Sequence, residues 1–222
     1  MTDASISRSL SSATRVQPTV LEVERLAVRR GGRTIIDAIE MTVTAGEIVG
    51  VVGKNGCGKS TLLACLAGVL APRDGRVIVD GAAVWGTRRD RTRARHALGY
   101  VPEGADPPGF LLADELWSLC AASREAEPPS QKLRDALGLD ELRATPIDRM
   151  SLGQRRRACL GAAFVGPPKL LVLDEPDNGL DAKRLDALVG LLKEHAASGG
   201  ATVLASHDAI MLEQLDARVF PM

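Results

Sequence analysis

The stretch GKNGCGKS, residues 53–60, decides the fold. It has the spacing G-x-x-x-x-G-K-[ST] of a phosphate-binding loop. The residues before it, 47–52 (EIVGVV), predict a buried strand, and those that follow, 59–70 (KSTLLACLAGVL), predict an apolar helix. In such a strand, loop and helix, backbone N–H groups converge on one anion. The matching flanks favour a phosphate site over a chance glycine-rich turn.

The residue types in the loop suit a bound nucleotide. The glycines let the backbone approach phosphates without an intervening Cβ. Lys59 supplies a cation for the β- and γ-phosphates, and Ser60 supplies a hydroxyl for Mg²⁺, with Thr61 beside it. The expected nucleotide contacts in this part of the chain are Gly53, Lys54, Asn55, Gly56, Cys57, Gly58, Lys59, Ser60 and Thr61.

Length and composition limit the class of protein. A chain of 222 residues suits one domain with room for a small subdomain. The formal net charge is zero, which gives no electrostatic case for nucleic acid as a partner. No apolar run reaches the roughly 18–20 residues that span a bilayer. The four cysteines form no C-x-x-C pair, so we expect either reduced cytosolic thiols or small core residues.

The chain divides into an N-terminal tail and one domain. Residues 1–18 are rich in Ser, Thr and Arg without an apolar core, which indicates a flexible tail rather than a signal peptide. Residues 20–29 alternate apolar and polar side chains, a second strand covers 34–43, and Gly31-Gly32 marks the turn between them. This pattern predicts an antiparallel β subdomain before the phosphate loop, within a domain of residues 19–222.

Strands and helices alternate through the rest of the chain. Short strands are expected at 76–80, 98–101, 169–174, 201–205 and 217–220, and helices at 111–125, 131–142, 152–165, 181–197 and 209–215. Five arginines between residues 87 and 95 predict a solvated helix face. We interpret residues 104–165 as a mostly helical insertion. The expected fold class is α/β, with a mostly parallel central sheet covered on both faces.

Acidic residues and a histidine follow three of the expected strands. In an open parallel sheet, ligands bind beyond the carboxyl ends of the strands. Asp174 is expected to hold Mg²⁺ because a hard cation prefers oxygen ligands, and Glu175 to polarise an attacking water. His207 is expected to hydrogen-bond the γ-phosphate. Alone, each such residue is more often an ordinary core or surface group, but together behind a phosphate loop they favour hydrolysis of Mg·ATP.

Residues 19–222 resemble the ATP-binding subunit of ABC transporters, which has the P-loop NTPase fold. Six motifs occur in the order of that family. They are Walker A (residues 53–61), the Q-loop position (Glu103), the signature motif (150–154, MSLGQ), Walker B with its catalytic glutamate (170–175), the D-loop (178–181, NGLD) and the switch histidine (His207). By this resemblance Lys59, Glu175 and His207 are catalytic.

The resemblance also implies partners. It predicts a head-to-tail dimer of ATP-binding domains, of like or unlike chains, with ATP between Walker A of one chain and the signature motif of the other. Ser151, Gly153 and Gln154 are then nucleotide contacts made across the dimer. A multispanning membrane permease is the expected second partner, which places the chain in the cytoplasm as a peripheral protein at the inner face of the cell membrane.

Three positions depart from the family pattern. Leu152 stands where the family has glycine, which predicts hindered approach to the γ-phosphate. Glu103 replaces the usual glutamine and completes an expected metal site with Ser60 and Asp174. This glutamate and the NGLD sequence resemble the branch of the family whose separate membrane subunits often export lipids, drugs or peptides, so the resemblance implies export. No aromatic residue precedes Gly31 to stack on adenine, so the arginines at 29 and 30 either stack there or are simply exposed. The alternative function is a non-transport ABC-type ATPase acting on a macromolecular assembly.

Overall fold

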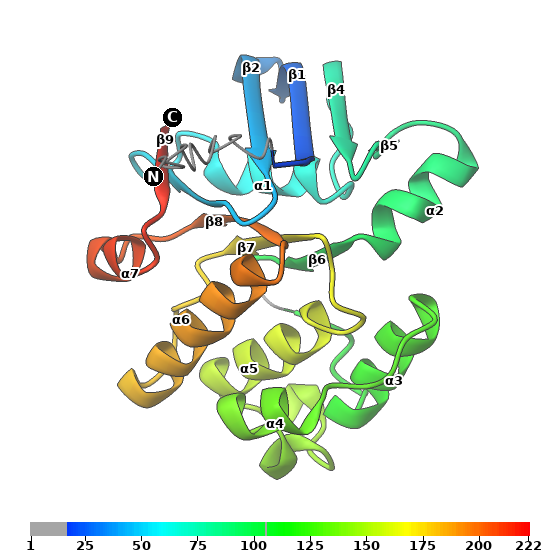
Figure 1. The fold of residues 1–222 in the computed structure, drawn as a ribbon, viewed down its shortest axis with the longest axis vertical. Coiled ribbons are helices and arrows are strands. Elements are labelled where there is room, and N and C mark those ends of the chain that lie inside the picture. The colour runs from blue at the N-terminus through cyan, green and yellow to red at the C-terminus, as the bar shows by residue number, and fades with distance from the viewer. Residues whose placement is uncertain (1–16, 105) are drawn as a thin grey trace, which may run out of the picture.

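A computed structural model describes residues 17–104 and 106–222 (Figure 1). The predicted flexible tail, apart from Gln17 and Pro18, lies outside the described residues. The elements are β1 (Thr19–Arg30), β2 (Arg33–Thr44), β3 (Ile48–Val52), α1 (Lys59–Leu66), β4 (Asp74–Val79), β5 (Ala82–Ala83), α2 (Arg88–His96), β6 (Leu98–Val101), α3 (Ala113–Ser123), α4 (Gln131–Leu137), α5 (Leu152–Ala163), β7 (Leu170–Asp174), α6 (Ala182–Ala197), β8 (Ala201–Ala205), α7 (Ala209–Gln214) and β9 (Arg218–Pro221).

The central sheet is parallel. Its strand order is β6-β7-β8-β3-β9, and each neighbouring pair runs in the same direction. Every residue of β7 and of β8 is buried, as expected for strands covered on both faces. The predicted α/β class is confirmed. Because the strands are parallel, the segments that follow β3, β6, β7 and β8 all leave the sheet on the same side, at the carboxyl ends of the strands.

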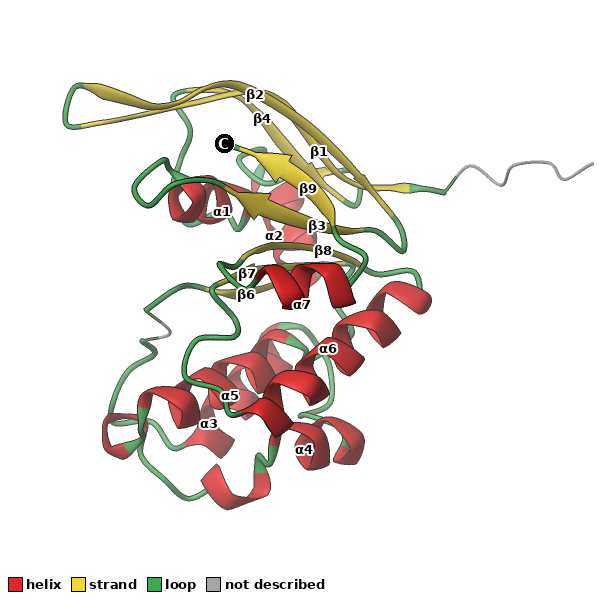
Figure 2. Cartoon of the chain, turned by 90° about the vertical axis from the view of Figure 1, so that its left-hand side faces the viewer, coloured by secondary structure: helices red, strands yellow, loops and turns green. Residues whose placement is uncertain are grey.

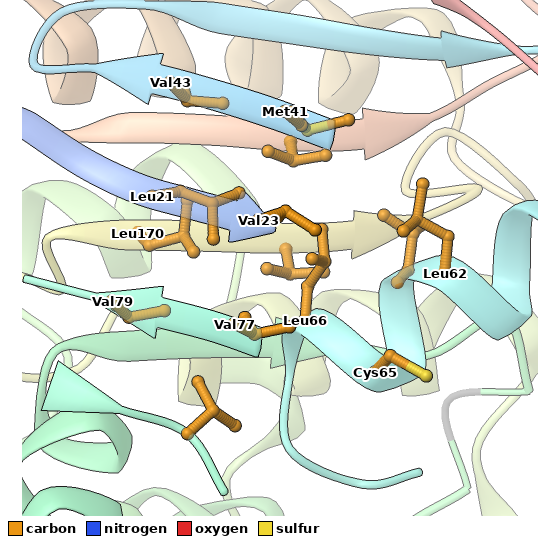
Figure 3. Close-up of a cluster of buried hydrophobic side chains, with 14 of the residues drawn as sticks. Leu21, Val23, Met41, Val43, Leu62, Cys65, Leu66, Val77, Val79 and Leu170 are labelled. Atoms are coloured by element: carbon orange, nitrogen blue, oxygen red, sulfur yellow. The ribbon is translucent and has the colours of Figure 1, made fainter. Parts of the chain in front are cut away.

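A four-stranded antiparallel sheet, β2-β1-β4-β5, forms a separate layer. Figure 2 shows this sheet above α1 and the parallel sheet below it. One apolar core joins the layers: Leu21 and Val23 of β1, Leu62 and Leu66 of α1, and Leu170 of β7 belong to it (Figure 3). The core therefore holds α1, and with it the end of the phosphate loop, between two sheets.

Helices α3, α5, α6 and α7 pack on the other face of the parallel sheet, with α4 at the outer end of the helical layer (Figure 1). Trp117 of α3 is fully buried, and its indole N–H donates to the carbonyl of Ala158 in α5 at 2.9 Å. Arg124, just after α3, donates to the carbonyl of Leu98 at 2.9 Å. Helices α3 and α5 are thus fixed to each other and to β6.

Two helices end four or five residues earlier than the sequence pattern predicts. The helix from Lys59 ends at Leu66 because Gly68 adopts φ +72°, and the helix from Gln131 ends at Leu137 because Gly138 adopts φ +60°. Glycine adopts this left-handed conformation without strain, so it terminates a helix that apolar periodicity would continue. Among the described residues, no helix has both the length and the apolar character needed to cross a membrane.

Candidate functional site

The loop between β3 and α1 has the backbone of a phosphate site. Gly56 adopts φ +79°, and Gly58 adopts φ +112° as the residue that precedes the helix. Lys59 is 8% exposed, and its ammonium donates to the carbonyls of Gly53 at 3.0 Å and Lys54 at 3.5 Å. The Lys59 side chain is therefore folded back over the loop, which places its charge where a phosphate would lie.

A cavity of about 410 Å³ lies at the carboxyl ends of the parallel strands. Its lining residues are Asn55, Gly56, Lys59, Ser60, Glu103, Glu175, Asn178 and His207. The cavity thus joins side chains from the phosphate loop with those that follow β6, β7 and β8. A larger hollow of about 770 Å³ includes Ala121, Pro128 and Phe164 at the far ends of α3 and α5, and it contains none of the predicted site residues. Catalytic groups, not volume, identify the smaller cavity as the site.

Asp174 and Ser60 form the part of the site that suits a metal. Asp174 is 2% exposed, and this burial raises the pKa of its carboxyl, with the nearby Glu103 carboxylate acting in the same direction. A hydrogen bond from the Ser60 side chain acts the opposite way. A buried carboxylate beside a second carboxylate gains strongly from a bound cation. Ser60 and Asp174 therefore fit Mg²⁺.

No cluster of three or more His, Cys, Asp or Glu side chains in the described residues is arranged as a metal cage. Mg²⁺ ordinarily takes one or two protein ligands and completes its shell with phosphate oxygens and water. The donor set therefore suits a metal that arrives with a nucleotide.

Glu175 and His207 face each other at the cavity. Glu175 Oε1 and His207 Nε2 are 3.3 Å apart, and the Glu175 side chain is only 15% exposed. Burial raises the pKa of Glu175, and His207 partly offsets the rise. Glu175 also adopts φ +48°, an uncommon conformation that turns the chain away from the strand. A carboxylate with raised proton affinity, pointed into the cavity, suits a general base.

The signature residues lie elsewhere. Ser151 is the N-cap of α5: its hydroxyl accepts a hydrogen bond from the backbone N–H of Gln154 at 3.2 Å, and the Gln154 side chain accepts one from the backbone N–H of Ser151 at 2.9 Å. Ser151, Gly153 and Gln154 do not line the cavity of their own chain. Leu152 beside them is 45% exposed. The start of α5 is accordingly presented outward.

The predicted loop contacts divide into two groups. Asn55, Gly56, Lys59 and Ser60 line the cavity, whereas Gly53, Lys54, Cys57, Gly58 and Thr61 do not. The thiol of Cys57 instead lies against Gly53, where an added Cβ would be 2.7 Å from its sulfur.

Two residues near the site were not among the predicted site residues. Asn178 lines the cavity, and its backbone N–H donates to the backbone carbonyl of Glu175 at 3.1 Å. Arg156 of α5 is fully buried and donates to the backbone carbonyls of Pro102, Glu103 and Asp174. The NGLD sequence pointed toward Asn178. The run of three arginines at 155–157 contained no signal that one of them is buried.

The sequence profile described as ABC transporter matches residues 36–178. The chain belongs to the ABC transporter family. As an ATP-binding subunit of this family it is an ABC-type ATPase.

Relatives of this ABC ATPase have several roles. It is 36% identical to the cytochrome c biogenesis ATP-binding export protein CcmA of Nitrosococcus oceani, covering 86% of this chain and 87% of that one. It is 35% identical to the cobalt import ATP-binding protein CbiO of Rhodobacter capsulatus, over 85% of this chain and 70% of that one. It is 39% identical to a Streptomyces avermitilis protein assigned as an ABC transporter ATP-binding protein, covering 90% of this chain but only 36% of that longer one.

Solved structures show the same fold. The ABC ATPase superposes on a structure described as the ATP-binding subunit of an ABC transporter with a TM-score of 0.81, 25% identity, and coverage of 89% of this chain and 83% of that one.

Proposed function

We propose that this ABC ATPase hydrolyses Mg·ATP to drive export through a separate, multispanning membrane permease. It would act as a cytoplasmic protein held at the inner face of the cell membrane. The observation that carries the proposal is the convergence of Lys59, Ser60, Glu175 and His207 on one cavity, with the Asp174 carboxylate buried beside Ser60.

The proposal gives each side chain a task. Lys59 would hold the β- and γ-phosphates, and Ser60 and Asp174 would hold Mg²⁺, with Glu103 facing the same cavity. A metal held there would supply positive charge to offset that of the phosphates. Glu175 accepts a proton from the attacking water, and His207 keeps the Glu175 carboxylate oriented and donates to the γ-phosphate.

A second ATP-binding chain, of the same or a different sequence, completes the site. The start of α5 offers backbone N–H groups and the positive end of the helix dipole. Because Ser151, Gly153 and Gln154 do not reach the cavity of their own chain, they are available to a nucleotide held by the partner. ATP would then hold two chains together, and hydrolysis would release them.

The segment after β6 is the proposed contact with the permease. Phe110 is 81% exposed and Leu119 of α3 is 57% exposed, both of them large apolar side chains. They follow Glu103, so a membrane subunit docked there would sense the cavity through a short stretch of chain. The CcmA relative supports export and the CbiO relative import; Glu103 and the NGLD sequence favour export. None of these names supports the non-transport alternative.

The test is reconstitution. The chain is co-expressed with the multispanning protein encoded beside its gene and placed in vesicles with ATP accessible on one side. The proposal predicts ATP-dependent movement of cargo away from the ATP side, abolished by Glu175→Gln. An ATPase rate that is the same with and without the membrane protein would contradict coupling. Movement of cargo toward the ATP side would contradict export.

A further inference from the structure

Three consecutive arginines of α5 have three different surroundings. Arg155 forms an ion pair with the exposed Asp106 at 3.4 Å. Arg157 donates to the carbonyls of Leu137 and Gly138, both at 3.0 Å. Arg156, between them, has no exposed surface. The helix therefore sends one guanidinium to the surface, one to the end of α4 and one inward to the sheet.

The Arg156 guanidinium contacts two segments at the nucleotide site. One terminal nitrogen donates to the carbonyls of Pro102 at 2.9 Å and Asp174 at 3.1 Å, and the other donates to the carbonyl of Glu103 at 2.6 Å. Pro102 and Glu103 follow β6, and Asp174 ends β7. One side chain thus connects α5 to the ends of two neighbouring strands.

Few other hydrogen bonds hold the segment after β6, and one of them joins the backbone N–H of Glu103 to the Asp174 carboxylate. No turn or loop hydrogen bond between backbone groups of the described chain involves residues 102–104. A planar guanidinium has donors in a fixed fork, so it sets the relative positions of the carbonyls it binds. Burial lowers the pKa of Arg156 from its usual value, but an arginine remains protonated at neutral pH. Its charge also lies near the carboxylates of Asp174, Asp177 and Glu103.

We propose that Arg156 is a positioning residue that ties residues 102–104 and the end of β7 to the first half of α5, so that these three elements keep one arrangement at the nucleotide site. Its role in turnover rests on the proposed function. The signature helix, the segment that leads to the permease contact and the metal-binding strand end would then move as a unit. Without Arg156, Glu103 and Asp174 would lose their common anchor, whereas the Lys59 loop would keep its own hydrogen bonds.

The test compares Arg156→Gln and Arg156→Lys with Arg157→Gln in the full-length chain. The Arg157 variant is the control because it also removes a guanidinium that binds backbone carbonyls, together with the Glu141 carboxylate, but away from the cavity. Three quantities are measured: amide hydrogen exchange without nucleotide, the Kd for a fluorescent ATP analogue with Mg²⁺, and kcat for ATP.

We expect Arg156→Gln to speed exchange in the peptide 98–104 by at least about tenfold at the amides of residues 103 and 104, because Arg156 holds the carbonyls of Pro102 and Glu103, whereas residues 98–101 keep their pairing with β7. We expect kcat to fall about 10- to 100-fold, since displacing a reacting group by about 1 Å has effects of that order, with Kd changed less than about threefold. Lysine keeps the charge without the fork, so Arg156→Lys should fall between. Arg157→Gln should speed exchange at residues 131–142 and leave kcat within about twofold.

An unchanged exchange rate in the peptide 98–104 of folded Arg156→Gln would overturn the proposal. Faster exchange of that peptide in Arg157→Gln, to the same extent as in Arg156→Gln, would overturn it too. If the glutamine variant does not fold, Arg156→Lys carries the same comparison. A wild-type chain without ATP turnover, even with its membrane partner, would instead refute the proposed function. The exchange measurement would still judge Arg156, because it needs no nucleotide.

Discussion

Gly153→Ala tests how α5 meets the turn after Glu175. A Cβ built at Gly153 would lie 2.1 Å from the carbonyl oxygen of Gly179, roughly 1 Å closer than such atoms approach in proteins. The Cβ is bonded directly to Cα and the oxygen belongs to the backbone, so a change of side-chain rotamer cannot relieve the overlap. Either the start of α5 or the turn at 177–179 must move.

Gly190→Ala supplies the control. Gly190 lies in α6, and a Cβ there would meet nothing within 4 Å. Alanine in a helix is favoured over glycine by roughly 0.5–1 kcal/mol, so Gly190→Ala should raise the free energy of unfolding by about that amount. The difference between the two variants then measures the overlap. Overpacking costs about 1–3 kcal/mol, and a backbone carbonyl places this case near the upper end, about 2–3 kcal/mol.

The assay is urea unfolding and thermal melting of both variants, followed by ATPase rates. For a chain of this size, about 2–3 kcal/mol corresponds to a Tm difference of roughly 4–12 °C. The ATPase rate of Gly153→Ala should fall about tenfold, because Asn178 next to Gly179 lines the cavity and donates to the Glu175 carbonyl. If Gly153→Ala is as stable as Gly190→Ala within about 0.5 kcal/mol, the close approach of α5 to the turn is wrong.

Other changes test the chemistry and the electrostatics. Glu175→Gln should keep ATP binding, lose turnover and retain a nucleotide-bound dimer in gel filtration; turnover at the wild-type rate would remove Glu175 from the role of base. Leu152→Gly should raise the ATPase rate, because the 45%-exposed leucine stands among the signature residues that a partner's nucleotide would approach, and an unchanged rate would mean that it obstructs nothing. Burial lowers the pKa of His195 below its ordinary 6.5. At pH values just below 6.5 the unfolded chain therefore binds a proton at this histidine more readily than the folded chain does. The free energy of unfolding then falls as the pH falls. Urea unfolding between about pH 7 and pH 5.5 should show a smaller loss for His195→Asn than for the wild type, and equal losses would exclude His195 as the cause.

Local patterns predicted most elements of the domain. The strands 169–174 and 201–205 are short apolar runs, and burial on both faces is what such runs need, so their place inside a parallel sheet followed from composition. Helix ends were less predictable. Apolar periodicity continues past Leu66, and only the left-handed backbone at Gly68 ends the helix there. Periodicity reports which face is buried, whereas a terminus depends on the conformation of one residue.

The sequence by itself determined the chemistry of the phosphate loop, because the glycines, Lys59 and Ser60 act within a few consecutive residues. The tertiary structure alone decided which distant groups join them. Glu175 and His207 meet only because β7 and β8 are adjacent and parallel. Arg156 is buried, unlike Arg155 and Arg157, because it lies on the side of α5 that faces the sheet. Contacts between residues far apart in the chain depend on how the layers pack, which spacing along a sequence does not contain.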